Sequence, residues 1–337
     1  MSRAESKGKS GSDKRGNPAK GSGAGSATTA KAEPEGHDGD AGRPAVLKTY
    51  KLFVGGKFPR SESGRVYQVT DPDGAWLANP PLSSRKDARD AVVAARKAFA
   101  GWSGATAYNR GQVLYRVAEM LEGRREQFAA EVARAEGLSR RRAVEQVEAA
   151  VDRWVWYAGW ADKLTQVVGG ANPVAGPYFN LSVPEPTGVV AVFAPAGSSL
   201  LGVVSVLAPV LVGGNTAVLV ADERAPLPAL SLAEVLATSD VPGGVVNVLS
   251  GRAGELGPPL AAHRDVNAID LTGVGDADLA TELEREAAEN LKRVVRPVRS
   301  ADGTVGPPAD VVGEGDPGTA RMTPFLEIKT VWHPMGV

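Results

Sequence analysis

Residues 189–220 read VVAVFAPAGSSLLGVVSVLAPVLVGGNTAVLV. An apolar run at 189–193 leads through a loop of glycine and serine into helix formers at 200–212, and a second apolar run follows at 216–220. Neither run alternates with polar residues, which is typical of strands that are covered on both faces. This stretch therefore predicts two parallel strands joined by a crossover helix.

Three further apolar runs follow, at 245–249, 266–271 and 291–295, and helix formers separate them at 229–237 and 276–289. The pattern predicts an α/β protein with a doubly wound, mainly parallel sheet of five strands. In such a sheet the ligand crevice lies outside the carboxyl ends of the strands. We therefore expect the site to be lined by the loops that follow the strands, at 194–199, 221–225, 250–257 and 272–276.

Other segments flank the predicted sheet. Residues 1–48 are rich in Lys, Ser, Gly and Ala and poor in apolar side chains, so we expect a disordered tail before a folded domain at 49–297. Within that domain, apolar residues at helical spacing over 84–164 predict a layer of about four helices. Gly, Pro, Asp and Glu dominate 298–323, which predicts a linker, and alternating apolar residues within 324–337 predict a final strand.

Composition excludes several kinds of site. The 337 residues include no cysteine, so the chain cannot form a disulfide, a thiolate nucleophile or a Cys-ligated metal site. His37, His263 and His333 have no partner at metal-binding spacing, so we expect no metal. The 38 basic and 39 acidic residues nearly balance, which disfavours nucleic acid as a partner. No apolar run is long enough for a membrane span or a secretion signal, so we expect a cytoplasmic protein without membrane contact.

Gly251, Gly254 and Gly257 lie between a predicted strand and a predicted helix that follows them. Glycines in this place allow backbone N–H groups to approach a phosphate. The same residues also permit close packing of a helix against its neighbours. The spacing alone leaves both interpretations open.

Several longer motifs, all in one order, resemble the NAD(P)-dependent aldehyde dehydrogenase superfamily. They are EPTGVVAVFAP at 185–195, LAP at 207–209, GNTAVL at 214–219, PGGVVNVLSG at 242–251 and LTG at 271–273. Together with a matching helical segment from Ala94 to Arg110, they cover the chain from about residue 50 to 297. The resemblance implies the Rossmann-like cofactor domain of that family, with the helices placed before it.

The resemblance also implies a site for NAD or NADP, and two departures imply weak binding. Val220 stands where the family carries the Lys that contacts the adenosine ribose, and Val274 stands where it carries the Ser that meets the pyrophosphate. Glu223 remains from the ribose-binding motif. The cofactor-binding positions that the resemblance implies are Pro195, Glu223, Gly254, Gly257, Thr272 and Gly273.

The catalytic positions of the family depart further. Gly197 stands where the family has the Asn whose amide stabilises the oxyanion, and Pro297 stands where it has the Glu that acts as general base. The nucleophilic Cys has no counterpart in this chain. Loss of one oxyanion donor alone costs about 3–4 kcal/mol of transition-state stabilisation, so the resemblance implies that no catalytic residue remains.

A whole domain is also missing. The family inserts a catalytic domain after the cofactor domain, and here only residues 298–323 occupy that interval. The segment FLEIKTV at 325–331 nevertheless resembles the family's C-terminal oligomerisation strand, which joins a hairpin, here about 164–183, in a small β arm. An internal deletion fits both facts. In the family this arm docks on the catalytic domain of a neighbouring subunit.

We therefore expect a catalytically inactive aldehyde dehydrogenase homologue that acts as a structural or regulatory partner. The expected partner is a full-length aldehyde dehydrogenase in a hetero-oligomer, or a second copy of this chain in a homo-oligomer. An active NAD(P)-dependent oxidoreductase acting on the aldehyde or oxo group of donors is the alternative. A dinucleotide-binding module without activity is a third hypothesis.

Overall fold

The computed structural model describes residues 46–313 and 315–336. The tail predicted at 1–48 therefore lies almost entirely outside the described residues. From Leu47 onward the residues group into one unit. Lys48 is already anchored in this unit, because its Nζ donates a hydrogen bond to Ser231 Oγ at 2.7 Å.

Five parallel strands form the central sheet, in the order β7-β6-β5-β8-β9. They are β5 (Val189–Phe193), β6 (Thr216–Val220), β7 (Val246–Leu249), β8 (Ala268–Asp270) and β9 (Arg293–Val295). The prediction of an α/β fold with a doubly wound, mainly parallel sheet is confirmed. The strand order reverses between β5 and β8, which makes this pair the topological switch point.

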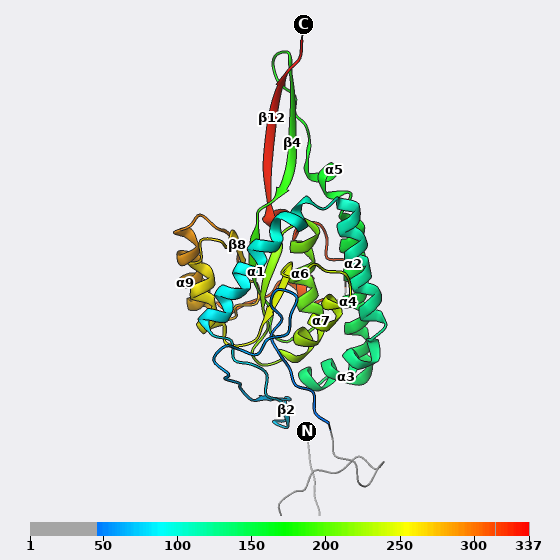
Figure 1. The fold of residues 1–337 in the computed structure, drawn as a ribbon, viewed down its shortest axis with the longest axis vertical. Coiled ribbons are helices and arrows are strands. Elements are labelled where there is room, and N and C mark those ends of the chain that lie inside the picture. The colour runs from blue at the N-terminus through cyan, green and yellow to red at the C-terminus, as the bar shows by residue number, and fades with distance from the viewer. Residues whose placement is uncertain (1–45, 314, 337) are drawn as a thin grey trace, which may run out of the picture. The chain divides into compact units, whose positions relative to one another are not determined.

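Helices cover both faces of the sheet (Figure 1). Helices α6 (Leu201–Val212) and α7 (Leu227–Ala237) pack on one face, and α1 (Arg85–Gly104), α8 (Ala253–Ala261) and α9 (Ala277–Ala288) pack on the other. Every residue of β5 and β6 is buried, because successive side chains point to opposite covered faces. This double coverage explains why the strands read as unbroken apolar runs.

The helical layer predicted over 84–164 contains four helices, but they divide between the two faces. Helices α2 (Ala107–Glu122), α3 (Arg125–Glu136) and α4 (Arg140–Trp160) join the α6 and α7 face, whereas α1 crosses to the other face. Trp154 and Tyr157 of α4 are fully buried there. No helix in the described part of the chain is long and apolar enough to cross a membrane.

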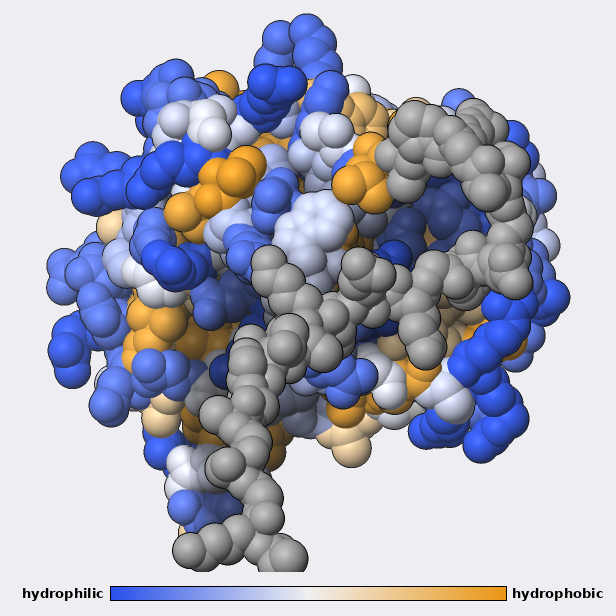
Figure 2. All heavy atoms as spheres, turned by 90° about the horizontal axis from the view of Figure 1, so that it is seen from below, coloured by the Kyte–Doolittle hydropathy of each residue, from blue (hydrophilic) through white to orange (hydrophobic). Residues whose placement is uncertain are grey.

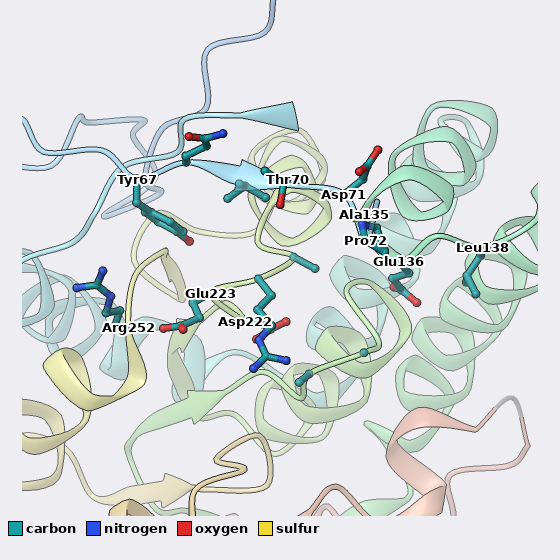
Figure 3. Close-up of a pocket in the computed structure, with 16 residues that line it drawn as sticks. Tyr67, Thr70, Asp71, Pro72, Ala135, Glu136, Leu138, Asp222, Glu223 and Arg252 are labelled. Carbon is teal, nitrogen blue, oxygen red and sulfur yellow. The ribbon is translucent and has the colours of Figure 1, made fainter. Parts of the chain in front are cut away.

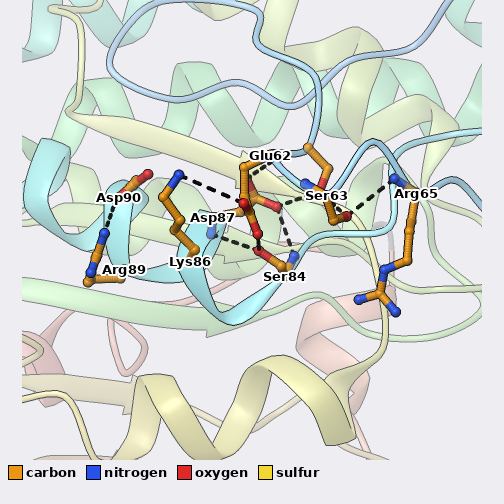
Figure 4. A network of polar contacts seen from close by, with 9 residues as sticks. Glu62, Ser63, Arg65, Ser84, Lys86, Asp87, Arg89 and Asp90 are labelled. Carbon is orange, nitrogen blue, oxygen red and sulfur yellow. Dashed lines mark hydrogen bonds and ion pairs between the residues drawn. The ribbon is translucent and has the colours of Figure 1, made fainter.

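A polar network fixes the start of α1 (Figure 4). Ser84 Oγ accepts from the backbone N–H of Asp87, and the Asp87 carboxylate accepts from the backbone N–H of Ser84 at 2.8 Å. The same carboxylate accepts from Ser61 Oγ at 2.7 Å, which ties the N-terminal segment to the helix. This reciprocal arrangement is the capping box that satisfies two otherwise unpaired donors.

A separate three-stranded sheet forms the arm, which extends beyond the helices (Figure 1). After the short α5 (Leu164–Val168), its strands are β3 (Gly170–Ala171), β4 (Tyr178–Pro186) and β12 (Leu326–Pro334), in the order β12-β4-β3. Strands β4 and β12 pair antiparallel along their whole length, from Leu326 opposite Pro186 to Pro334 opposite Tyr178. Beyond Leu326 every residue of β12 is exposed.

The segment at 298–323, expected to be a linker, folds back on the sheet. It contains β10 (Val298–Arg299), β11 (Val305–Gly306) and α10 (Ala309–Val312), and the 3-10 helix η1 (Thr323–Phe325) follows it. Val311, Met322 and Phe325 are buried in the same core as α6. Arg153 of α4 holds the segment, because its guanidinium donates to the carbonyl oxygens of 311, 313 and 315 at 2.7–3.1 Å. The apolar residues of this segment are widely spaced, so no local sequence pattern predicts its packing.

Candidate functional site

A cavity of about 780 Å³ lies outside the carboxyl ends of β5, β6 and β7. The loops after these strands contribute Gly197, Glu223 and Arg252 to its wall. The N-terminal segment around β1 (Val69–Thr70) and the end of α3 close it from the other sides, whereas β1 itself pairs with β2 (Trp76–Ala78). Figure 3 shows Tyr67, Glu223 and Arg252 on one side of the cavity and Glu136 on the other.

Two adjacent carboxyl groups follow β6. Glu223 is exposed to the cavity, whereas Asp222 is partly buried. Burial raises the pKa of Asp222, although the backbone N–H groups of Arg224 and Ala225 oppose this effect. Arg252, which follows β7, lies on the same side of the cavity as Glu223 (Figure 3) and pairs with Glu255 at 2.9 Å.

Tyr67 places an unsatisfied hydroxyl at this wall. Its ring is directed toward Glu223 (Figure 3), and its hydroxyl is buried with no hydrogen-bond partner among the described residues. Burial raises the pKa of the Tyr67 phenol, and the negative charges of Asp222 and Glu223 raise it further. A neutral phenol here can donate one hydrogen bond and accept another from a bound molecule.

Glu136 fixes the loop that follows β5. One carboxylate oxygen accepts hydrogen bonds from the backbone N–H of Ser199 at 2.7 Å and from Ser199 Oγ at 2.5 Å. Burial raises the pKa of Glu136, and these two bonds oppose the increase. Gly197 in the same loop has φ +75°, and a Cβ there would meet nothing within 4 Å. A glycine is therefore favoured here by the positive φ of the turn, and not by close packing against a neighbouring atom.

Of the sequence-predicted cofactor positions, Glu223 lines the cavity. Gly197, which the resemblance places at a catalytic position, lines it as well. Pro195 is buried beneath the loop, where it packs so close to Gly202 that a Cβ on that glycine would lie 2.5 Å from Pro195 Cγ. Among the described residues that line the cavity, none comes from 272–276. Thr272 is instead fully buried, and its Oγ1 lies 3.3 Å from Nη2 of Arg321.

Gly254 and Gly257 lie inside α8 rather than in a loop, because the helix already begins at Ala253. A Cβ on Gly257 would lie 2.8 Å from Leu283 of α9, whereas a Cβ on Gly254 would meet nothing within 4 Å. Of the two interpretations of this motif, the structure favours close helix packing for Gly257. Neither glycine is among the residues that line the cavity.

The catalytic positions offer no reactive group. Gly197 has no side chain, Pro297 lies between β9 and β10 without an ionisable atom, and the sequence contains no cysteine. Within residues 46–313 and 315–336, no group of three or more His, Cys, Asp or Glu side chains is placed to hold a metal ion.

Three residues have no signal in the sequence. Tyr67 and Glu136 reach the cavity from segments far from the predicted strand loops. Arg321 is buried beside Asp270, although arginine is ordinarily a surface residue. The loops that follow the strands could be placed at the site because the strands themselves could be predicted. Contacts from other segments of the chain could not be predicted in this way.

The aldehyde dehydrogenase family model matches residues 58–298. The aldehyde dehydrogenase of Davidiella tassiana is 34% identical over 252 residues, which cover 72% of this chain and 49% of that protein. Retinal dehydrogenase 2 of Gallus gallus is 34% identical over 259 residues, covering 74% of this chain and 48% of that protein. This chain thus spans about half the length of these two relatives.

Solved structures agree with the sequence relatives. The NAD+ complex of an aldehyde dehydrogenase from Bacillus cereus is 29% identical, has a TM-score of 0.69, and covers 73% of this chain and 50% of that chain. HpcC from Thermus thermophilus is 31% identical with a TM-score of 0.70, over 73% of this chain and 47% of that chain. The sheet described above is therefore the NAD-binding fold of these proteins, and this chain belongs to the aldehyde dehydrogenase family.

Proposed function

We propose that this chain is a catalytically inactive member of the family that acts as a structural or regulatory partner of a full-length aldehyde dehydrogenase. The observation that carries the proposal is an exposed arm on a chain without a reactive centre. The family's chemistry needs a thiolate, a general base and an oxyanion donor. The matching positions of this chain supply none of the three.

The two serines of the loop after β5 do not replace the missing thiol. Ser198 Oγ accepts a hydrogen bond from the backbone N–H of Gly202 at 2.8 Å. Ser199 Oγ donates to Glu136, which also binds the backbone N–H of Ser199. Both hydroxyls are buried and serve to hold the loop. A serine hydroxyl that is not activated and is already hydrogen-bonded is a much weaker nucleophile than a thiolate.

The arm supports the role of a partner. Strand β12 leaves one edge unpaired along nine residues, because β4 pairs only with its other side. Its exposed apolar side chains include Ile328 and Trp332, with 51% and 59% of their surface exposed. Proteins usually cover such an edge. Seen from below, by contrast, the visible surface is mainly hydrophilic with small separate apolar groups (Figure 2).

The proposal includes weak binding of NAD or NADP. Glu223 remains beside the cavity, but Val220 and Val274 are buried aliphatic residues without hydrogen-bonding groups. Losing one hydrogen bond to a charged group costs about 1.5–3 kcal/mol, or roughly 10- to 100-fold in affinity. We therefore expect binding far weaker than that of an enzyme that keeps these groups.

Two measurements test the proposal. Purified chain with several aldehydes and NAD+ or NADP+ should give no NAD(P)H absorbance above the uncatalysed rate. Size-exclusion chromatography with light scattering should show a stoichiometric complex when the chain is mixed with a full-length homologue from the same cell. Turnover would favour the alternative of an active oxidoreductase. A stable homo-oligomer that ignores the homologue would refute the partner role.

A further inference from the structure

The crevice at the topological switch point is filled by the chain itself. Doubly wound sheets bind ligands outside the carboxyl ends of the strands where the strand order reverses. Here that place lies between the ends of β5 and β8. Arg321, from the segment that follows α10, lies at the end of β8 and donates to Asp270 Oδ2 at 2.7 Å. Asp270 is the last residue of β8.

The loop after β8 is closed on both sides. Arg321 also lies within 3.3 Å of Thr272 Oγ1, and the next residue, Met322, is fully buried. On the side toward β5, a Cβ on Gly273 would lie 2.2 Å from the carbonyl oxygen of Ala194. A ligand that crosses from β5 to β8 would therefore have to displace the Arg321 side chain from a buried ion pair.

The open part of the site lies over β5, β6 and β7 alone. Its wall includes the carboxylate of Glu223 and the unpartnered hydroxyl of Tyr67. An acidic residue in this position of a doubly wound sheet is suited to the hydroxyl groups of a ribose. Four carboxyl groups against two guanidinium groups line the cavity, which disfavours a ligand with several phosphates.

We propose that Arg321 is a specificity-determining residue that limits the cavity to one nucleotide unit. The ligand class is a ribonucleoside or its monophosphate, and a dinucleotide gains nothing from its second half because Arg321 fills the crevice where that half would lie. The inference rests on the proposed function only in assuming that some nucleotide binding is retained. It does not depend on the arm or on any partner protein.

Calorimetry with AMP and NAD+ tests this on the full chain. Because the second nucleotide finds no site, the two dissociation constants should agree within about threefold. Glu223→Gln should weaken both ligands equally, which places them in this cavity. A wild-type affinity for NAD+ at least about tenfold above that for AMP would overturn the proposal, and so would a failure of AMP to bind. These comparisons in the wild-type chain require no variant of the buried pair.

Two matched double variants distinguish the effect of the Arg321 side chain's volume from the effect of its charge. Asp270→Asn with Arg321→Ala removes both charges and empties the crevice, so NAD+ should bind at least about tenfold more tightly while AMP is unchanged. Asp270→Asn with Arg321→Met removes the same charges but keeps the crevice filled, so it should behave like the wild type. Thermal unfolding confirms that both variants fold. Equal NAD+ affinity in the two variants would overturn the role of Arg321, and the assembly and turnover measurements would still stand.

Discussion

Nη2 of Arg321 lies 2.7 Å from Oδ2 of Asp270, and only 8% and 0% of the two side chains are exposed. Removing one partner of a buried ion pair leaves an uncompensated charge, which costs about 3–5 kcal/mol. Arg321→Ala should therefore lower the free energy of unfolding by that amount in urea denaturation. Asp270→Asn with Arg321→Met should recover most of the loss.

The exposed Arg299 on β10 provides the control for this prediction. Arg299→Ala should change the free energy of unfolding by less than about 0.5 kcal/mol. If Arg321→Ala cost no more than Arg299→Ala, the buried pair of Asp270 and Arg321 would not contribute to the stability of the fold.

Glu136 should make stability depend on pH. Burial raises its pKa in the folded chain, so its contribution to stability is fully present below the ordinary pKa of a glutamate and is lost as pH rises through the folded value. Glu136→Gln keeps the oxygen that accepts from Ser199 and removes the charge. The variant should unfold at a higher temperature than the wild type near about pH 8, with a smaller difference near about pH 4. Glu282→Gln, on the exposed side of α9, is the control, and an advantage of equal size at both pH values would contradict the prediction.

Gly254 and Gly257 should respond oppositely to the same substitution. Gly257→Ala forces a Cβ to within 2.8 Å of Leu283, so it should lower the free energy of unfolding by about 1–3 kcal/mol. Gly254→Ala meets no atom and should raise it by up to about 1 kcal/mol, because alanine favours the helix. Urea denaturation measures both. A loss of AMP binding in Gly254→Ala would instead indicate that this glycine serves the ligand.

Trp332 should be a principal contact of the arm with its partner. Its side chain is 59% exposed and packs against Tyr178 with ring centroids 5.8 Å apart. Tryptophan at the centre of an interface typically contributes about 2 kcal/mol or more, so Trp332→Ser should weaken the complex with a full-length homologue by at least about tenfold. Trp76→Ser, at a position that is 43% exposed on β2, should leave assembly unchanged. Equal effects of the two changes in light scattering would argue against docking through the arm.

The sequence predicted the central sheet well and its surroundings less well. Fully buried strands produce unbroken apolar runs, so each of the five was found within two residues of its bounds. Helix α8 begins at Ala253, inside the glycine motif, whereas the sequence predicted a helix only after that motif. Gly197 and Glu223 could be placed at the site because they follow strands. The approach of Glu136 to Ser199, and of Arg321 to Asp270, joins residues far apart in the chain, and no local pattern encodes such contacts.

The chain leaves the sheet after β9 and returns beside the same strand, because η1 packs against β9. There the Phe325 carbonyl oxygen accepts from the backbone N–H of Thr187 at 3.1 Å and from Asn215 Nδ2 at 2.9 Å. The chain between these two points forms a loop whose ends lie close together. Doubling the length of such a loop costs only about 0.6 kcal/mol of closure free energy. A domain can be removed or inserted at this point while the base of the arm stays in place. Under the proposed function, removal of a domain here yields a chain that keeps the arm of an enzyme subunit without its catalytic centre.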